Sequence, residues 1–366
     1  MIYFDNASTT KMDESVIEIM NKSFEDDFAN PSSLHSLGFS VEKMIRDARL
    51  KFAKFFKVKA DQIFFSPSAS IANNTVLMSL IDKNKKILVS EVEHSSIINL
   101  LKNNPDANYD FIKVNEYGFV DEEDLLSKVD DETALVSIMH VQNELGSINN
   151  INRLARLCKE KNPKVLFHSD GVQALNKIEI DLKDVDFYTI AGHKVNGPKG
   201  IGVLFVRNKN NIHPLYFGGG QESGLFSGTE NTYAIMGFAK ALELNNNYEE
   251  IKKVKDYLRK GLEKIEGIRI ISPLDNASPY ILNICIEGIG AEILLHYLEM
   301  DEVYISTGSA CSKGAESRVL KAIGLDDEAV KGCIRISFDR NSSLEEGSIF
   351  LEKLEEKINL IRRIIK

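Results

Sequence analysis

The sequence predicts an α/β protein with a mainly parallel sheet of seven strands and a second, smaller α+β unit. Two observations support this prediction. Short apolar runs alternate with amphipathic helical patterns between about residues 36 and 206, and the alternation stops after Asn231. Strands that alternate with helices are typical of a parallel sheet covered by helices. Ligands of such sheets bind beyond the carboxyl ends of the strands, so the residues after each strand are the first candidates for a site.

The first region contains the candidate strands of the sheet. They span residues 62–65, 86–90, 109–113, 134–139, 165–168, 187–190 and 201–206. Helical patterns lie between them, at residues 40–56, 70–81, 95–102, 122–129 and 151–161. Each helical pattern follows a strand or leads into one, as in units that build parallel sheets.

The second region begins with a helical pattern that runs to about residue 266 and is interrupted near residues 245–247. Further strands are expected at 269–271, 281–286, 303–305 and 333–338, with a helix from Ala291 and a last helix over 344–366. We therefore predict a large domain of residues 12–245 and a small domain of residues 1–11 and 246–366.

Composition excludes several classes of protein. Hydrophobic residues make up 43% and charged residues 27% of the 366 residues, as in ordinary globular proteins. The net charge of −9, without a Lys/Arg block, argues against direct nucleic-acid binding. No apolar run approaches the roughly 18 residues of a membrane span, and the first residues do not resemble a signal peptide. We expect a soluble cytoplasmic protein.

Four cysteines are present, and no two form a CxxC pair. The sequence therefore predicts no zinc or other metal site and no disulfide framework. Cys158 and Cys285 lie in helix and strand patterns typical of buried packing residues. Cys311 lies in a small, polar segment, residues 306–314, where a thiol can be reactive.

Three side chains follow predicted strands and are candidates for chemistry. Lys194 follows the strand at 187–190; a dry lysine at this place can form a Schiff base, although a solvated lysine in a Gly/Pro turn is the alternative. Asp170 could pair with a protonated ring nitrogen of a cofactor or cap a helix. His94 could stack on a cofactor or move protons, or begin a helix as a polar residue.

Two further features suggest binding of anions. Residues 66–70 (SPSAS) follow a strand and open a helix, whose free N–H groups bind anions, but Ser68 or Ser70 could instead be simple caps. Arg335 shares a strand face with Cys333 and Ser337, while the intervening residues face the core. An arginine held this way suits a carboxylate, or a structural ion pair.

Several short motifs occur in one order along the chain. They are DNASTT at 5–10, NPSSxH at 30–35, His94, NExG at 143–146, DxxQ at 170–173, GHK at 192–194, GGGQE at 218–222, SGTEN at 227–231, GSAC at 308–311 and Arg335. This series resembles the cysteine desulfurase family, pyridoxal-phosphate (PLP) enzymes of aminotransferase class V with fold type I. The GSAC segment resembles the subgroup with a longer, flexible cysteine loop that serves iron–sulfur assembly.

The resemblance implies a role for each matching residue. Lys194 would be the Schiff-base lysine, Asp170 would pair with the pyridinium nitrogen, Gln173 with the ring oxygen, and His94 would stack on the ring and shuttle protons. Cys311 would accept the substrate sulfur. The phosphate would be held by Ala69, Ser70, His193 and the partner subunit's Thr229. The substrate carboxylate would be held by Asn143 and Arg335, and Asn143 would also border the cofactor.

The activity that the resemblance implies is conversion of L-cysteine to L-alanine, with a persulfide left on Cys311. Lys194 would remove the Cα proton while PLP acts as the electron sink. The persulfide sulfur would pass to an acceptor protein, either an iron–sulfur scaffold or a tRNA-thiolating enzyme. Because Thr229 acts across a subunit interface, the resemblance also implies a homodimer.

The chain departs from the family pattern at the phosphate. Ser68 stands where the family has glycine, Ile71 where it has an acid, Ala191 where it has serine, and Phe226 where it has arginine. Each charge-assisted hydrogen bond contributes about 1.5–3 kcal/mol, so we expect weaker PLP binding. The alternatives are another class V reaction, such as a selenocysteine lyase or an aminotransferase, and a non-catalytic dimeric scaffold.

Overall fold

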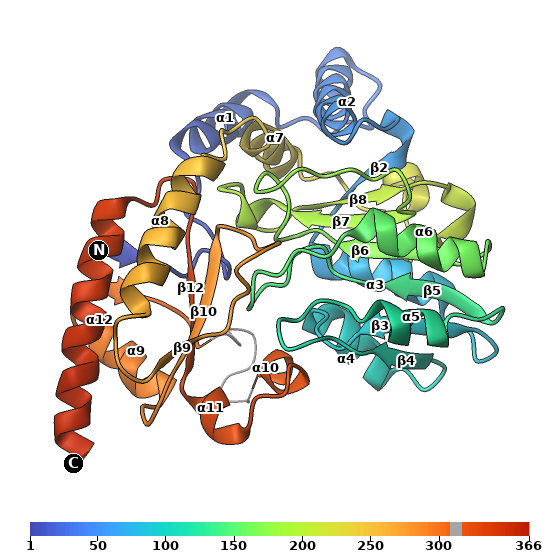
Figure 1. Ribbon diagram of the computed structural model, residues 1–366. Coiled ribbons are helices and arrows are strands. Elements are labelled where there is room, and N and C mark those ends of the chain that lie inside the picture. Colours follow the sequence, from blue (N-terminus) through green and yellow to red (C-terminus); the bar gives the residue numbers. More distant parts are fainter. Residues whose placement is uncertain (308–316, 366) are drawn as a thin grey trace.

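The computed structural model describes residues 1–307 and 317–365, so Cys311 lies outside the described residues. A seven-stranded sheet forms the centre of the larger part of the molecule (Figure 1), in the order β2-β8-β7-β6-β5-β3-β4. Its strands are β2 (Ile63–Ser66), β3 (Lys86–Ser90), β4 (Asn108–Ile112), β5 (Thr133–Ser137), β6 (Leu166–Asp170), β7 (Phe187–Ala191) and β8 (Gly202–Val206). Only β8 runs antiparallel to its neighbours, which confirms the predicted mainly parallel sheet.

Helices cover both faces of this sheet. One face packs against residues of α1 (Glu14–Asp26), α2 (Ser36–Phe56), α5 (Glu122–Lys128), α6 (Ile151–Lys161) and α7 (Thr232–Ala241). The other face packs against α3 (Ala69–Leu80) and α4 (Ser95–Asn103). Because both faces are covered, strands such as β7 and β8 are apolar along nearly their whole length.

The smaller part is built on an antiparallel sheet in the order β12-β10-β9, with strands β9 (Ile268–Ile270), β10 (Ile281–Ile286) and β12 (Cys333–Ser337). A separate parallel pair joins β1 (Ile2–Tyr3) to β11 (Val303–Tyr304). Three helices pack here: α8 (Tyr248–Leu262), α9 (Ala291–Glu299) and α12 (Leu344–Ile365). Ile2 and Phe4 belong to the same core, which supports placing residues 1–11 with the small domain; the domain boundaries themselves stay a prediction.

Several elements differ from the prediction. Helix α2 begins at Ser36, four residues early, because the Nδ1 atom of His35 accepts from Gly38 N–H at 3.2 Å and caps it. Four elements were not predicted: β1, α1 and the short helices α10 (Arg318–Ala322) and α11 (Asp327–Lys331). Strand β1 and helices α10 and α11 are too short to carry a recognisable periodicity, whereas the 13-residue helix α1 is long enough to have been recognised. The predicted interruption between α7 and α8 is confirmed, with Asn247 at a φ of 52°.

Short 3₁₀ helices are present at η1 (Ala60–Gln62), η2 (Gly192–Lys194), η3 (Lys209–Asn211) and η4 (Gln221–Gly224). Of the helices in the described ranges, none is both long and apolar enough to cross a membrane.

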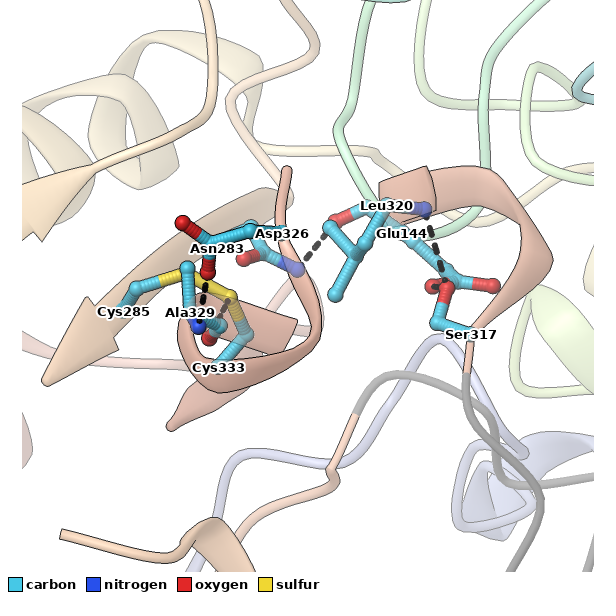
Figure 2. The surroundings of a disulfide bond; sticks show 8 residues. All are labelled: Glu144, Asn283, Cys285, Ser317, Leu320, Asp326, Ala329 and Cys333. Atoms are coloured by element: carbon cyan, nitrogen blue, oxygen red, sulfur yellow. Dashed lines mark hydrogen bonds between the residues drawn. A yellow bond between two sulfur atoms is a disulfide. The ribbon is translucent and has the colours of Figure 1, made fainter. Parts of the chain in front are cut away.

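The interpretation of Cys285 as a mere packing residue is wrong. Figure 2 shows Cys285 on β10 joined to Cys333 on β12 by a disulfide, although the two residues are 48 positions apart in the sequence. Ile286 N–H donates to Gly332 O, and Phe338 N–H donates to Tyr280 O. Because hydrogen-bonded and non-hydrogen-bonded pairs alternate along antiparallel strands, Cys285 and Cys333 face each other as a non-hydrogen-bonded pair. Opposite side chains come closest at such pairs, and this register cannot be derived from the spacing of the cysteines. Cys158 is buried as predicted, and burial raises the pKa of its thiol to about 12.

Candidate active site

A pocket of about 800 Å³ lies at the carboxyl ends of the parallel strands and extends to the small domain. The predicted site residues that line it are Ala69, Ser70, His94, Asn143, Asp170, Gln173, His193, Lys194 and Arg335. Thr229 is exposed and does not line this pocket, and Cys311 lies outside the described residues. The structure therefore brings together residues that are separated by more than 260 positions in the sequence.

Asp170 is the last residue of β6 and is buried in the pocket wall. Its Oδ1 atom accepts from Val172 N–H at 2.9 Å, and its Oδ2 atom accepts from Asn73 Nδ2 at 2.8 Å. Both oxygens of this buried carboxylate thus have a hydrogen-bond donor from the chain itself. Sequence reasoning missed Asn73, although two consecutive asparagines within a largely apolar helical pattern were an available signal.

His94 is linked to Asp170 through side chains of the chain itself. The Nδ1 atom of His94 accepts from Ser96 N–H at 3.2 Å and lies 2.9 Å from Ser96 Oγ. Ser96 Oγ in turn accepts from Asn73 Nδ2 at 3.0 Å. Because a backbone N–H can only donate, Nδ1 is an acceptor and the neutral ring carries its proton on Nε2. The expected role as a helix-start residue is also confirmed, since His94 caps α4.

Lys194 lies in η2, directly after β7, and reaches the N-terminal DNASTT motif. Its Nζ atom donates to Ala7 O at 2.7 Å and to Ser8 O at 2.6 Å. The alternative of a solvated lysine in a turn is therefore wrong, because tertiary contacts hold the amine in the pocket. Burial, aided by the charges of Lys194 and Lys199, lowers the pKa of the neighbouring His193 to about 4, so its ring is neutral.

Arg335 is 2% exposed and extends from β12 toward the same segment. Its guanidinium donates to Asn143 O at 3.0 Å, to Asp5 Oδ1 at 2.9 Å and to Ser8 Oγ at 2.7 Å. The expected structural ion pair is confirmed, with Asp5 as the partner. Arg335 also lines the pocket, so the same group is placed to meet an anionic ligand.

The pocket end near α3 departs from the family pattern. Ser68 caps α3, with its Oγ atom accepting from Ile71 N–H at 3.2 Å, which confirms the capping interpretation for this serine. Ala191 presents only a methyl group. Phe226 is buried in the core between α3 and the sheet, and Ile71 packs against that core. The departures from the family pattern are thus filled by apolar packing.

Two buried carboxyl groups were missed by sequence reasoning. The Oε1 atom of Glu93 accepts from Ser90 Oγ at 2.6 Å and from Met139 N–H at 2.7 Å, and complete burial raises the pKa of Glu93 to about 8. Glu144 accepts from Ser317 Oγ at 2.6 Å (Figure 2), and burial raises its pKa as well. The sequence did offer a signal for both acids, because Glu93 directly precedes His94 and Glu144 directly follows Asn143.

Comparison with known proteins identifies the family. The sequence profile of the aminotransferase class V family matches residues 2–350. The NifS/IcsS protein homolog of Lactobacillus delbrueckii subsp. bulgaricus is 37% identical, over 97% of each chain. Cysteine desulfurase IscS of Clostridium botulinum is 36% identical, over 99% of this chain and 96% of the relative.

Solved structures agree with these sequences. A NifS-like protein superposes with a TM-score of 0.92 at 33% identity, covering 98% of this chain and 99% of the other. A NifS-like protein from Rickettsia africae superposes with a TM-score of 0.88 at 31% identity and the same coverage. The predicted resemblance and fold class are confirmed, whereas the subgroup assignment from the GSAC segment stays a prediction. The chain belongs to the aminotransferase class V family, and its relatives include cysteine desulfurases.

Proposed function

We propose that the protein is a PLP-dependent cysteine desulfurase that converts L-cysteine to L-alanine and forms a persulfide on Cys311. The observation that carries this proposal is one pocket that combines the Lys194 amine, the buried Asp170 carboxylate and the Arg335 guanidinium. The similarity to proteins named cysteine desulfurase, over nearly the full chain, supports the same reaction.

The residues of the pocket fit PLP. Asp170 offers a carboxylate for the protonated ring nitrogen, and Lys194 offers an amine to the aldehyde. His94 lines the same pocket, with its neutral tautomer set by Ser96. Ala69, Ser70 and His193 line the part of the pocket at the N-terminus of α3, where backbone N–H groups suit a phosphate.

The chain's own groups supply binding and proton transfer. Arg335 binds the substrate carboxylate with donors that Asn143 O, Asp5 and Ser8 already orient. The Lys194 amine would accept the Cα proton of the substrate. PLP, when bound, would supply the electron sink for this deprotonation. His94 Nε2–H is the donor for a proton returned to the substrate.

Sulfur transfer requires a thiol. The Cys311 thiolate attacks the substrate sulfur, the substrate Cβ–S bond breaks, and an S–S bond forms on Cys311. The former Cβ then gains a proton, which leaves L-alanine and a persulfide from one cysteine and one thiol. No external oxidant or reductant is needed, because the transferred sulfur itself becomes the persulfide sulfur.

We also propose that the protein acts as a homodimer in the cytoplasm and passes its sulfur to an acceptor protein. Thr229 is exposed and lies outside the pocket of its own chain, which supports its use as the partner subunit's Thr229. Large apolar side chains on the surface, including Phe28, Phe39 and Phe217, support a covered face.

Replacing Cys311 tests the reaction. Cys311→Ser should keep the visible absorption of the PLP-loaded protein but lose persulfide formation and nearly all alanine release from L-cysteine. Cys158→Ala, which removes a thiol from the core, is the matched control and should retain turnover. Mass spectrometry after borohydride reduction should place PLP on Lys194.

Three results would contradict the proposal. Near-normal alanine release by Cys311→Ser would favour another class V reaction, such as a selenocysteine lyase or an aminotransferase. PLP found on Lys199 would overturn the assignment of Lys194. A colourless protein that takes up no PLP would favour a non-catalytic scaffold.

A further inference from the structure

A second lysine, Lys177, is buried beside the pocket without an acidic partner. It is 5% exposed, and its Nζ atom donates to Gln173 Oε1 at 3.1 Å and lies 5.7 Å from the ring centroid of Tyr280. Among the described residues, no carboxylate forms an ion pair with it. Lysine is almost never buried unless it is paired, so the contact with Gln173 calls for an explanation.

The hydrogen bonds around Gln173 determine how its amide is oriented. Lysine has only donors, so the amide oxygen of Gln173 must face Lys177. The Nε2 atom then faces the other way and donates to Ala7 O at 2.9 Å. An amide nitrogen carries two hydrogens, and Gln173 lines the pocket, which leaves a second N–H for a ligand.

The same carbonyl connects Gln173 to the site lysine. Ala7 O accepts from both Gln173 Nε2 and Lys194 Nζ, the latter at 2.7 Å. Hydrogen bonds therefore connect Lys177 to Gln173, Gln173 to Ala7 O, and Ala7 O to Lys194. A change at Lys177 reaches Lys194 through two intermediate groups without any contact between the two lysines.

We propose that Lys177 is a positioning residue that fixes the amide of Gln173 so that its N–H groups, and not its oxygen, face the bound cofactor. This inference rests on the proposed function, because the ligand that receives the N–H is the ring oxygen of PLP. A donor at that oxygen stabilises its anionic form, whereas a flipped amide would place an acceptor against it.

The charges that face Lys177 are compatible with this role. Burial, together with the positive charges of Lys194 and Arg335, lowers the pKa of Lys177 to about 7, while Asp339 opposes the shift. The ammonium form of Lys177 has only donors, whereas the neutral amine also has an acceptor lone pair, so the ammonium is the form that fixes the orientation of the Gln173 amide.

The test compares two buried lysines in the PLP-loaded protein. Lys177→Met keeps the chain length but removes the donor, and it should weaken PLP binding about fivefold, as expected for one hydrogen bond. It should also shift the pH titration of the visible absorption band. Lys177→Arg, which restores a donor, should recover the wild-type titration.

Lys255→Met is the matched control. Lys255 is equally buried, its Nζ atom donates to Ser278 O at 2.7 Å, and burial lowers its pKa to about 7 as well. Unlike Gln173, the acceptor of Lys177, its acceptor Ser278 does not line the pocket. If both variants lower stability while only Lys177→Met changes the PLP dissociation constant and the spectrum, the effect is specific to the site. Equal effects on the spectrum would overturn the proposal.

A double-mutant cycle identifies the route. If Lys177 acts through Gln173, then Lys177→Met should have no further effect on PLP binding in a Gln173→Ala background. Additive effects would overturn the inference. If Lys177→Met fails to fold, Gln173→Glu replaces it as the test. The new carboxylate can pair with Lys177, but it presents only acceptors to the pocket, so PLP binding should weaken. Unchanged PLP binding by Gln173→Glu would also overturn the inference.

The wild-type protein separates this inference from the proposed function. A wild-type protein that binds no PLP contradicts the function itself. A wild-type protein that binds PLP, with Lys177 variants that bind it equally well and show the same spectrum, contradicts only the role of Lys177.

Discussion

The two ends of the pocket differ in how much of their structure the chain supplies. At the ring end, Asp170 and His94 are held by Asn73 and Ser96, and Gln173 is held between Lys177 and Ala7 O. At the phosphate end, a serine caps its own helix and an alanine lines the pocket. One end is preorganised by buried side-chain bonds, and the other has mainly backbone donors.

This difference has energetic consequences for ligand binding. Polar groups buried at the ring end have already lost their hydration, and their mutual bonds offset that cost before a ligand arrives. The phosphate end keeps His193 and the N-terminus of α3, but the packing of Phe226 and Ile71 leaves it without the charged side chains of the family pattern. Under the proposed function, the link to Lys194 and the contacts of Asp170 would therefore contribute a larger share of the PLP affinity.

The largest expected effect comes from the buried acid at the ring end, Glu93. Burial raises the pKa of Glu93 from its usual 4.5 to about 8, so between these values the folded protein holds a proton that the unfolded chain releases. The free energy of unfolding should fall as pH rises through this window, by up to about 1.4 kcal/mol per pH unit. Glu93→Gln accepts the same hydrogen bonds and should abolish this part of the slope.

Urea denaturation at several pH values between 5 and 8 measures that slope. Glu91→Gln, which removes a half-buried acid from the same loop, is the control for loss of one carboxylate. Parallel pH profiles for the wild-type protein and Glu93→Gln would show that Glu93 does not retain its proton in the folded state.

Next in size is the contact that holds Asp170. Asn73→Ala removes a donor to a buried carboxylate and breaks the line to Ser96, so PLP binding should weaken by about 1.5–3 kcal/mol, the range for bonds to charged groups. Equilibrium titration of the PLP-free protein with PLP measures the change. Asn74→Ala removes a bond to Ser96 O from a side chain that does not line the pocket, and it should have little effect on PLP. Equal losses in both variants would mean that helix packing, and not Asp170, is responsible.

The smallest effect is expected at the phosphate end. Ala191→Ser adds the hydroxyl that the family pattern has at this position, and one neutral hydrogen bond should tighten PLP binding by about 1 kcal/mol. Ala191→Gly controls for backbone changes, since it adds no donor. If the serine variant binds PLP as the wild-type protein does, another group already occupies this role, and the contrast between the two ends is smaller than the structure suggests.

Local patterns in the sequence were sufficient for much of the fold and for the members of the site. Apolar runs and helical periodicity predicted all seven strands of the large sheet, because each pattern is contained within a few neighbouring residues. Position after a strand marked His94, Asp170 and Lys194, since parallel strands end at one edge of the sheet. The order of the motifs identified the family.

Only the tertiary structure decided which groups support those residues. Asn73 meets Asp170 across 97 positions, Arg335 meets Asp5 across 330, and Cys285 meets Cys333 through the register of two antiparallel strands. Such partners depend on how distant elements pack, and no local periodicity encodes that packing. The chain thus determines by itself which residues can do chemistry, whereas the packing of distant elements against one another determines which protons, donors and charges surround them.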